Sequence, residues 1–278
     1  MDFNKVSFKN KISIYYKNQE PSKKHINLTL DLLKGKTNNM QLIKKDNGRE
    51  IYKTNINSKG YYFKKYSYRN FDKKLKNLIR RPAAYRSLKR TYQLLDNGIP
   101  VVKPVLAAVF KKNLWTYDSV FVTEDFGGEN MQKFIAFGEY DKNFKNKVIK
   151  KTAKIWAQMY NKNFVNGDPN LPGILIKVIN NDIHICLVDI DNIRRLFYIN
   201  KNIILKNMAN FNAHSYSGLG KLNGKKLNHE DRIFFLKNFI KFYDSKKINF
   251  VKVSDYICRE TYKLLKEWDK EHFFINRL

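Results

Sequence analysis

The pattern of apolar residues changes near residue 124 of this 278-residue chain. Before that point, aromatic-rich stretches such as residues 61–66 alternate with turn sequences such as residues 57–60, which is typical of an antiparallel meander. After it, apolar side chains recur at helical spacing, as Val148, Ile155 and Met159 do. The sequence therefore predicts an α+β protein with a small antiparallel sheet in its first half and a mainly helical second half.

The first half is expected to contain six strands, one short helix at residues 28–33 and one longer helix over about residues 73–96. Pro82 should interrupt the longer helix, because proline lacks the backbone N–H that the helix uses. Gly98 and Pro100 should end that helix, by a left-handed cap and by blocking its continuation. The predicted strands cover residues 11–16, 40–43, 50–56, 61–66, 105–110 and 119–123.

An acidic stretch with two adjacent glycines, residues 124–129, separates the two halves. We predict an N-lobe at residues 1–123, a hinge at residues 124–130 and a helical C-lobe at residues 131–278. No internal repeat or long linker is visible.

The chain carries 54 Lys and Arg against 25 Asp and Glu, a net charge of +29. Such a charge attracts anions: nucleic acid, anionic lipid or a phosphorylated substrate. The basic residues are spread along the chain rather than gathered in a tail, and no helix-turn-helix, zinc finger or RNP-like motif occurs, so nucleic acid is not the expected partner. The expected partner is instead an anionic saccharide or glycolipid acceptor, with possible peripheral contact with an anionic membrane.

The two cysteines, Cys186 and Cys258, form no CxxC motif, so we do not expect a structural zinc site. A low cysteine count of this kind is typical of proteins in a reducing cytoplasm. Cys186 lies in an apolar run and should be buried. No apolar stretch approaches the roughly 18–20 residues that cross a bilayer. We therefore expect a cytoplasmic protein that can lie at the surface of the inner membrane.

A polar segment at residues 166–173 interrupts the helical half. The apolar stretches on either side of the turn at residues 180–182 predict a hairpin directly after it. Such a hairpin would carry Asp189 back beside Asp168. An aspartate in a loop rich in Gly, Pro and Asn is often only a turn former, which is the alternative explanation.

Phosphoryl transfer needs this combination of side chains. One carboxylate must accept or orient the attacking hydroxyl, and a second must help to hold Mg²⁺, which prefers oxygen ligands. A lysine on a strand of the other lobe should hold the nucleotide phosphates. Asp168, Asp189 and Lys64 fit these roles in that order.

From about residue 42 to residue 243, the chain resembles the lipopolysaccharide core kinases, which phosphorylate Kdo or heptose sugars within the protein-kinase-like superfamily. The segments that carry the resemblance are the lysine-bearing strand at 62–66, the "GIPxPxP"-like turn at 98–104, the strand at 120–124, the "HGD"-like loop at 166–170, the "IDxD"-like segment at 187–191 and a late helix near 231–236.

The resemblance implies a two-lobed, protein-kinase-like fold that uses ATP and Mg²⁺. It implies that Asp168 is the catalytic base and that Lys64 contacts the nucleotide phosphates. It also implies that the backbone of the hinge residues Glu124, Asp125 and Phe126 faces adenine. It implies that Asp189 is the main Mg²⁺ ligand and that Asp191 supports the metal or the substrate. Asn170 is a further candidate metal ligand, which could substitute for an asparagine of the family pattern that this chain lacks at position 173.

Four positions depart from the family pattern. Asn166 replaces the loop histidine, and Gly173 replaces the asparagine expected five residues after the catalytic aspartate. The helix region 85–87 has no glutamate to pair with the strand lysine, and the phosphate loop at 46–49 has one glycine. A pseudokinase, a basic nucleic-acid- or membrane-binding module, and another small-molecule phosphotransferase therefore stay as alternatives to an ATP-dependent sugar kinase.

Overall fold

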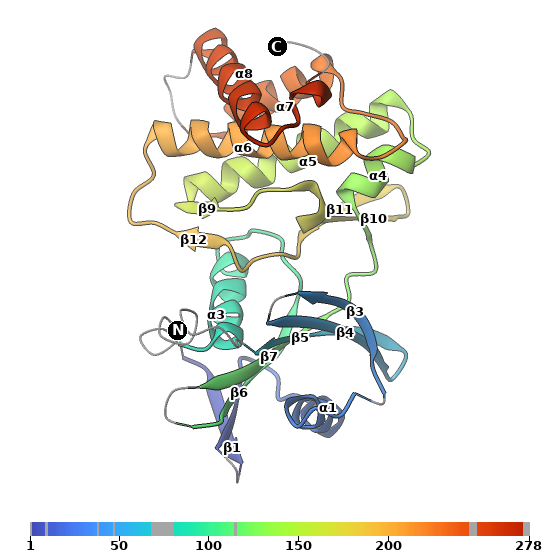
Figure 1. Ribbon diagram of the computed structural model, residues 1–278, viewed down its shortest axis with the longest axis vertical. Helices are drawn as coiled ribbons and strands as arrows, with labels where there is room; N and C mark the ends of the chain where they lie inside the picture. The colour runs from blue at the N-terminus through green and yellow to red at the C-terminus, as the bar shows by residue number, and fades with distance from the viewer. Residues whose placement is uncertain are drawn as a thin grey trace. The chain divides into compact units, whose positions relative to one another are not determined.

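The computed structural model describes residues 2–8, 11–37, 39–46, 48–67, 81–113, 116–244 and 249–274. The chain forms two compact units (Figure 1). Unit 1 comprises Met1–Asp96 and Val102–Gly127, and unit 2 comprises Asn97–Val101 and Gly128–Leu278. The predicted lobe and hinge boundaries stay a prediction.

Unit 1 contains a seven-stranded antiparallel sheet with the order β1-β2-β6-β7-β5-β4-β3. The six predicted strands correspond to β2–β7, whereas β1 was not predicted. The strands are β1 (Asn4–Phe8), β2 (Ile12–Tyr16), β3 (Gln41–Asp46), β4 (Arg49–Ile56), β5 (Lys59–Ser67), β6 (Pro104–Lys111) and β7 (Tyr117–Glu124).

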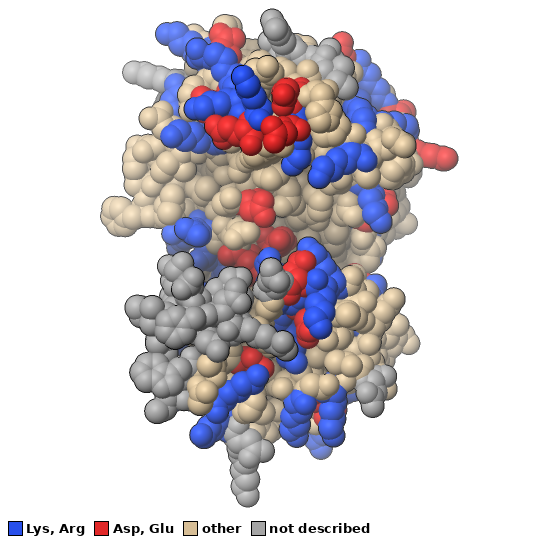
Figure 2. Space-filling model, viewed as in Figure 1, with Lys and Arg blue, Asp and Glu red and all other residues tan. Residues whose placement is uncertain are grey.

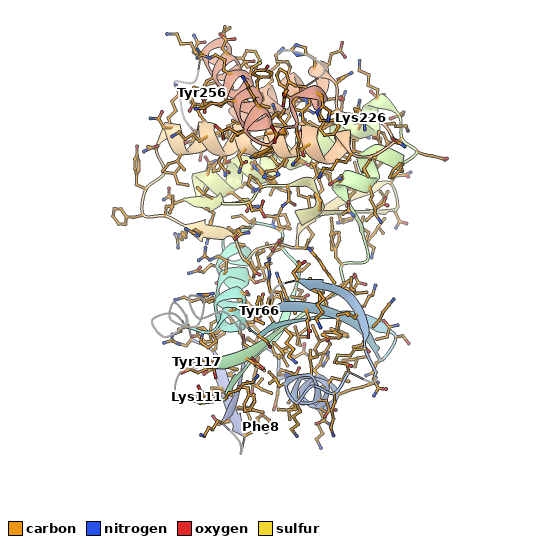
Figure 3. The ribbon with its side chains drawn as sticks, in the orientation of Figure 1. Phe8, Tyr66, Lys111, Tyr117, Lys226 and Tyr256 are labelled. Atoms are coloured by element: carbon orange, nitrogen blue, oxygen red, sulfur yellow. The ribbon has the colours of Figure 1, made fainter. Side chains whose placement is uncertain are left out.

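A helix covers each face of this sheet. On one face, Leu32 of α1 (Lys23–Leu33) packs in one core cluster with Phe63, and its carbonyl accepts a hydrogen bond from Lys65 Nζ at 2.9 Å. On the other face, the Tyr66 hydroxyl lies 3.2 Å from Ser87 Oγ of α3 (Ala83–Leu95); Figure 3 labels Tyr66. Because successive side chains of a strand alternate between faces, Lys64 shares the face of α3.

The longer predicted helix is confirmed over α3, while its expected part at residues 73–80 lies outside the described residues. Pro82 does not interrupt the described helix: it is the N-cap residue, with φ −51° and ψ 148°. The missing N–H of proline costs nothing there, because a helix leaves its first N–H groups unpaired.

Unit 2 is built mainly from helices and has two small sheets, whose strands β9–β12 lie below helices α5–α8 in the view of Figure 1. None of the described helices is long and apolar enough to cross a membrane. Its helices are α4 (Met131–Phe137), α5 (Lys142–Asn161), α6 (Lys201–Gly220), α7 (His229–Phe242) and α8 (Phe250–Glu267). Its strands are β8 (Glu129–Asn130), β10 (Ile174–Ile179) and β11 (Asp182–Leu187) in one sheet, and β9 (Phe164–Asn166) and β12 (Ile193–Arg195) in the other.

Side-chain caps and apolar stripes explain the helices of unit 2. The side chain of Asp141 accepts the Phe144 N–H at 2.6 Å and starts α5. Val148, Ile155 and Met159 of α5 are buried, as their helical spacing predicts, and the neighbouring Trp156 stacks on Phe211 of α6 with ring centroids 4.5 Å apart. A capping box starts α7: the Asn228 side chain accepts the Asp231 N–H, and the Asp231 side chain accepts the Asn228 N–H.

Charge is distributed broadly over the molecule: Figure 2 shows Lys and Arg on both units, on the visible face, rather than in one patch. Cys186 is buried as predicted, and burial raises the pKa of its thiol to about 12. That thiol is therefore a packing group rather than a nucleophile.

Residues 97–101 connect α3 to β6 but belong to unit 2. Gly98 takes a φ of +73°, which glycine adopts without steric cost. The Pro100 carbonyl then accepts the Leu187 N–H at 2.9 Å, and Val101 forms a parallel bridge with Leu187. This turn therefore supports the end of β11, two residues before Asp189.

Candidate functional site

The polar segment at residues 166–173 forms a loop between β9 and β10. Asn166 Oδ1 accepts the Asp168 N–H at 3.1 Å, and Asn170 Nδ2 donates to the Asp168 carbonyl at 3.2 Å. The Gly167 N–H donates to the Asn192 carbonyl at 2.9 Å. The backbone on both sides of Asp168 is therefore fixed, while its side chain is 45% exposed. A carboxylate held in this way can accept a proton from a bound hydroxyl.

Asn207 of α6 anchors this loop to the helices. Its Nδ2 donates to the Asn166 carbonyl at 2.6 Å, and its Oδ1 accepts the Tyr160 hydroxyl at 2.6 Å. Tyr160 is 3% exposed, and burial raises the pKa of its phenol. The three residues link α5, α6 and the loop in one buried network. The sequence analysis missed Asn207, because nothing near it in the sequence signals a loop contact.

His214, also on α6, lies beside the predicted catalytic carboxylate. Its Nε2 is 3.7 Å from Asp168 Oδ1, and its ring centroid is 4.8 Å from that of Trp268. Burial lowers the pKa of His214; Asp168 acts to raise this pKa and Lys270 to lower it. The imidazole is therefore mostly neutral at pH 7. The sequence analysis missed His214 as well.

The predicted hairpin brings Asp189 to the end of the same loop. Asn180 and Asn181 take φ values of 49° and 63° in the turn, as a tight hairpin requires. The strands then pair in register to Ile174 opposite Leu187, and the Val188 N–H donates to the Gly173 carbonyl at 3.0 Å.

Gly173 faces the half-buried Asp189 directly. A Cβ placed on Gly173 would lie 3.7 Å from Asp189 Cβ and 3.2 Å from Asn170 Oδ1. The amide oxygen of Asn170 therefore lies beside the space that a side chain at position 173 would enter. It accepts the Gly173 N–H at 2.9 Å and retains a second lone pair.

Asp191 lies in the turn that follows Asp189. The Ile193 N–H donates to the Ile190 carbonyl at 3.1 Å to close this turn, and the Asn192 carbonyl accepts the Gly167 N–H of the loop at residues 166–173. Within the described part of the chain, no group of three or more His, Cys, Asp or Glu side chains is arranged to hold a metal ion. An oxygen set of two carboxylates and an amide suits Mg²⁺, which completes its coordination with water and nucleotide phosphates.

The remaining predicted site residues belong to unit 1. Lys64 is half-buried on β5, opposite Phe121 of β7, with its Nζ 5.6 Å from the ring centroid of Tyr66. Its alternation in the strand places it on the sheet face covered by α3, where the family resemblance expects the phosphate-binding lysine.

The predicted adenine-facing residues use most of their polar groups within unit 1. Glu124 pairs with Lys59 at 3.2 Å and Lys103 at 3.3 Å, and its N–H donates to the Lys103 carbonyl. Asp125 pairs with Lys53 at 2.7 Å.

The Asp125 N–H donates to the Gly60 carbonyl at 2.9 Å, and Asp125 Oδ1 accepts the Gly127 N–H at 2.8 Å. Among the residues that the structure describes, neither the N–H nor the carbonyl of Phe126 forms a backbone hydrogen bond.

Comparisons with known proteins identify relatives of this chain. The family model described as "Lipopolysaccharide kinase (Kdo/WaaP) family" matches residues 33–223, more than half of the chain. No curated protein matches significantly.

Among solved structures, "WaaP in complex with acyl carrier protein" matches with a TM-score of 0.58 at 15% identity, covering 87% of this chain and 95% of that chain. This likeness supports the fold. "Crystal structure of Rad53 1-466 in complex with AMP-PNP" matches with a TM-score of 0.45 at 14% identity, covering 84% and 60% of the two chains. The predicted two-lobed, kinase-like α+β fold is confirmed.

Proposed function

Because the chain belongs to the lipopolysaccharide kinase (Kdo/WaaP) family, we propose that it transfers the γ-phosphate of ATP to a sugar hydroxyl of lipopolysaccharide core or a related glycolipid. One observation of this structure supports the proposal most: a loop fixed by Asn207 and Asn192 presents an exposed Asp168 carboxylate, and a hairpin returns Asp189 to the end of that loop.

Each predicted site residue has a role in this proposal. Asp168 accepts or orients the proton of the acceptor hydroxyl. Asp189, supported by Asp191 and the amide of Asn170, would hold Mg²⁺, which neutralises phosphate charge when bound.

Lys64 pairs with nucleotide phosphates, and the backbone at Phe126 meets the adenine edge. In this assignment the side chains of Glu124 and Asp125 shape the hinge through their lysine partners rather than contact the nucleotide.

A pseudokinase is the second candidate, because Gly173 offers no side-chain oxygen to a metal. The position of Asn170 Oδ1 beside Gly173 favours a working enzyme, since the missing amide has a neighbour of the same chemistry. A nucleotide-induced thermal shift that requires Mg²⁺ would support this reading, and nucleotide binding that ignores Mg²⁺ would support the pseudokinase.

We also propose where and with what the enzyme works. The +29 charge suits an anionic saccharide or glycolipid acceptor at the cytoplasmic surface of a membrane. The WaaP structure contains an acyl carrier protein, and we include such a carrier among the candidate protein partners of this chain.

Transfer of radiolabelled phosphate from ATP to acceptors that contain Kdo or heptose tests the function. Asp168→Ala should lower the transfer rate by about 10²–10⁴-fold, the usual contribution of a positioned base. Nucleotide binding should persist, because Asp168 is assigned to the acceptor. Asp182→Ala is the matched control, since that carboxylate lies exposed at the start of β11 and pairs with Lys151 of α5. Unchanged transfer in Asp168→Ala would refute the assignment.

A further inference from the structure

The connection from β12 to α6 exposes two adjacent aromatic side chains. Phe197 is 104% exposed and Tyr198 is 71% exposed, the two largest values for any large hydrophobic side chain that the structure describes. Single exposed apolar residues are ordinary on protein surfaces, but a contiguous exposed pair marks an interaction site. Neither side chain supports the core of its own unit.

The same connection carries positive charge. Arg194 and Arg195 precede the aromatic pair and are exposed, and the exposed Lys201 follows it at the start of α6. The sequence contains no acidic residue between Asp191 and Glu230. Tyr198 lies near the end of α7, since it acts to raise the pKa of Tyr243 there. At that end of α7 the exposed Lys241 and Asp244 offset each other, so these described charged residues sum to a positive charge.

The aromatic tip is held at both ends. On one side, the Leu196 N–H donates to the Asn163 carbonyl at 2.8 Å, and Arg195 lies over the Phe164 ring at 5.6 Å. On the other side, Ile199 is 6% exposed, and Asn200 caps α6 by accepting the Ile203 N–H at 2.9 Å. Ordered anchors on both sides present the tip in a fixed position, which lowers the entropy cost of inserting it into a partner.

The tip is also tied to the catalytic loop. β12 pairs with β9 so that Ile193 lies opposite Asn166, two residues before Asp168. Because the two strands are antiparallel, β12 runs away from Asp168: Arg195 lies opposite Phe164, and the Leu196 N–H donates to the Asn163 carbonyl. Phe197 and Asp168 are therefore about six residues apart along the strand direction, or roughly 20 Å at full extension. A saccharide that extends about this far from the headgroup layer would reach Asp168 when the tip contacts the lipid surface.

We propose that Phe197 and Tyr198 insert into the headgroup layer of an anionic lipid bilayer while Arg194, Arg195 and Lys201 contact lipid phosphates. Aromatic rings favour this interfacial depth, and guanidinium groups pair with phosphate in a bidentate geometry. The anchored tip holds the catalytic loop over a lipid-linked sugar. This inference rests on the proposed function and assigns the surface by which the enzyme reaches its acceptor.

Vesicle flotation of the full-length chain tests the proposal. Wild type should bind vesicles of phosphatidylcholine with about 30 mol % phosphatidylglycerol, and should not bind pure phosphatidylcholine. Replacing both Phe197 and Tyr198 by Ala should lower the partition coefficient by about tenfold or more. The matched control is Phe137→Ala, which alters a 55% exposed Phe at the end of α4, on the opposite side of unit 2 from β12 (Figure 1). It should change binding less than about twofold.

Two further measurements separate the possible outcomes. Phe197→Trp should add blue-shifted fluorescence with anionic vesicles, and brominated lipids should quench it. The double alanine variant should retain wild-type transfer to a lipid-free core oligosaccharide and lose transfer to the same acceptor in vesicles. If no variant or wild type phosphorylates any acceptor while vesicle binding still depends on the tip, the proposed function fails and the membrane surface stands.

Three results would overturn the proposal: no binding of wild type to anionic vesicles, equal losses in the double variant and in Phe137→Ala, or a tip that binds an acidic protein such as an acyl carrier protein and not vesicles. The last result would assign the surface to a protein partner. Because the mutated rings are exposed, melting temperatures should stay at the wild-type value and exclude a folding defect.

Discussion

Asn207→Ala should disconnect the loop at residues 166–173, which carries Asp168, from the helices of unit 2. The Asn207 side chain joins the buried Tyr160 hydroxyl to the Asn166 carbonyl through two hydrogen bonds of 2.6 Å. Tyr160 and Asn166 are 3% and 7% exposed, so water cannot easily replace the lost partners. Each buried group left unsatisfied costs about 1–3 kcal/mol, so the two groups together give a loss of about 2–6 kcal/mol. The melting temperature should fall by roughly 5–15 °C.

Urea unfolding of matched variants measures this loss. Tyr160→Phe keeps the ring and removes one donor, so it should cost only about 1 kcal/mol. The variant that combines Tyr160→Phe with Asn207→Ala should reveal a coupling energy of about 0.5–1.5 kcal/mol between the two substitutions. Asn202→Ala changes an exposed asparagine of the same helix and should stay within about 0.5 kcal/mol of wild type. If Asn207→Ala were as stable as Asn202→Ala, with unchanged phosphate transfer, the anchoring role would be wrong.

Two further changes test the metal assignment and the buried histidines. Gly173→Asn should tighten Mg²⁺-dependent nucleotide binding, measured by titration calorimetry, because it restores an amide whose Cβ would lie 3.7 Å from Asp189 Cβ. The new Cβ would also lie 3.2 Å from Asn170 Oδ1, which should lower the free energy of unfolding by about 1 kcal/mol. Unchanged nucleotide binding would place the metal elsewhere. Burial lowers the pKa of His25 and of His214 below the usual 6.5. The unfolded chain therefore binds more protons than the folded chain below about pH 6.5. The free energy of unfolding should fall as the pH drops from about 6.5 through the two folded-state pKa values. Replacing both histidines by Leu should flatten that slope, and a slope that persists would assign it to other groups.

Local patterns explain which parts of the site could be predicted from the sequence. Asp168 and Asp189 are connected by a short hairpin whose turn, at Asn180 and Asn181, is encoded by adjacent residues. The return of Asp189 to the loop that carries Asp168 therefore follows from turn chemistry and strand pairing alone. Six of the seven strands of unit 1, β2–β7, were predictable for the same reason.

Contacts between distant segments explain what the sequence did not reveal. Asn207 and His214 reach the loop from α6, about forty residues further along the chain, and helical periodicity predicts only which face is buried. The sequence also did not reveal that Glu124 and Asp125 pair with Lys53, Lys59 and Lys103. Pairing of this kind depends on sheet order, which a local pattern does not specify.

The turn at residues 97–101 makes the two units interdependent in sequence, since it lies between two segments of unit 1 and belongs to unit 2. A fragment that starts at Gly128 would lack the Pro100 carbonyl that pairs with the Leu187 N–H. The segment that carries Asp189 and Asp191 would then lose the hydrogen bond and the strand bridge that hold Leu187 just before it. A chimaera that grafts this helical half onto the sheet of a relative must therefore carry the five-residue turn with it, although the turn lies far upstream in the gene.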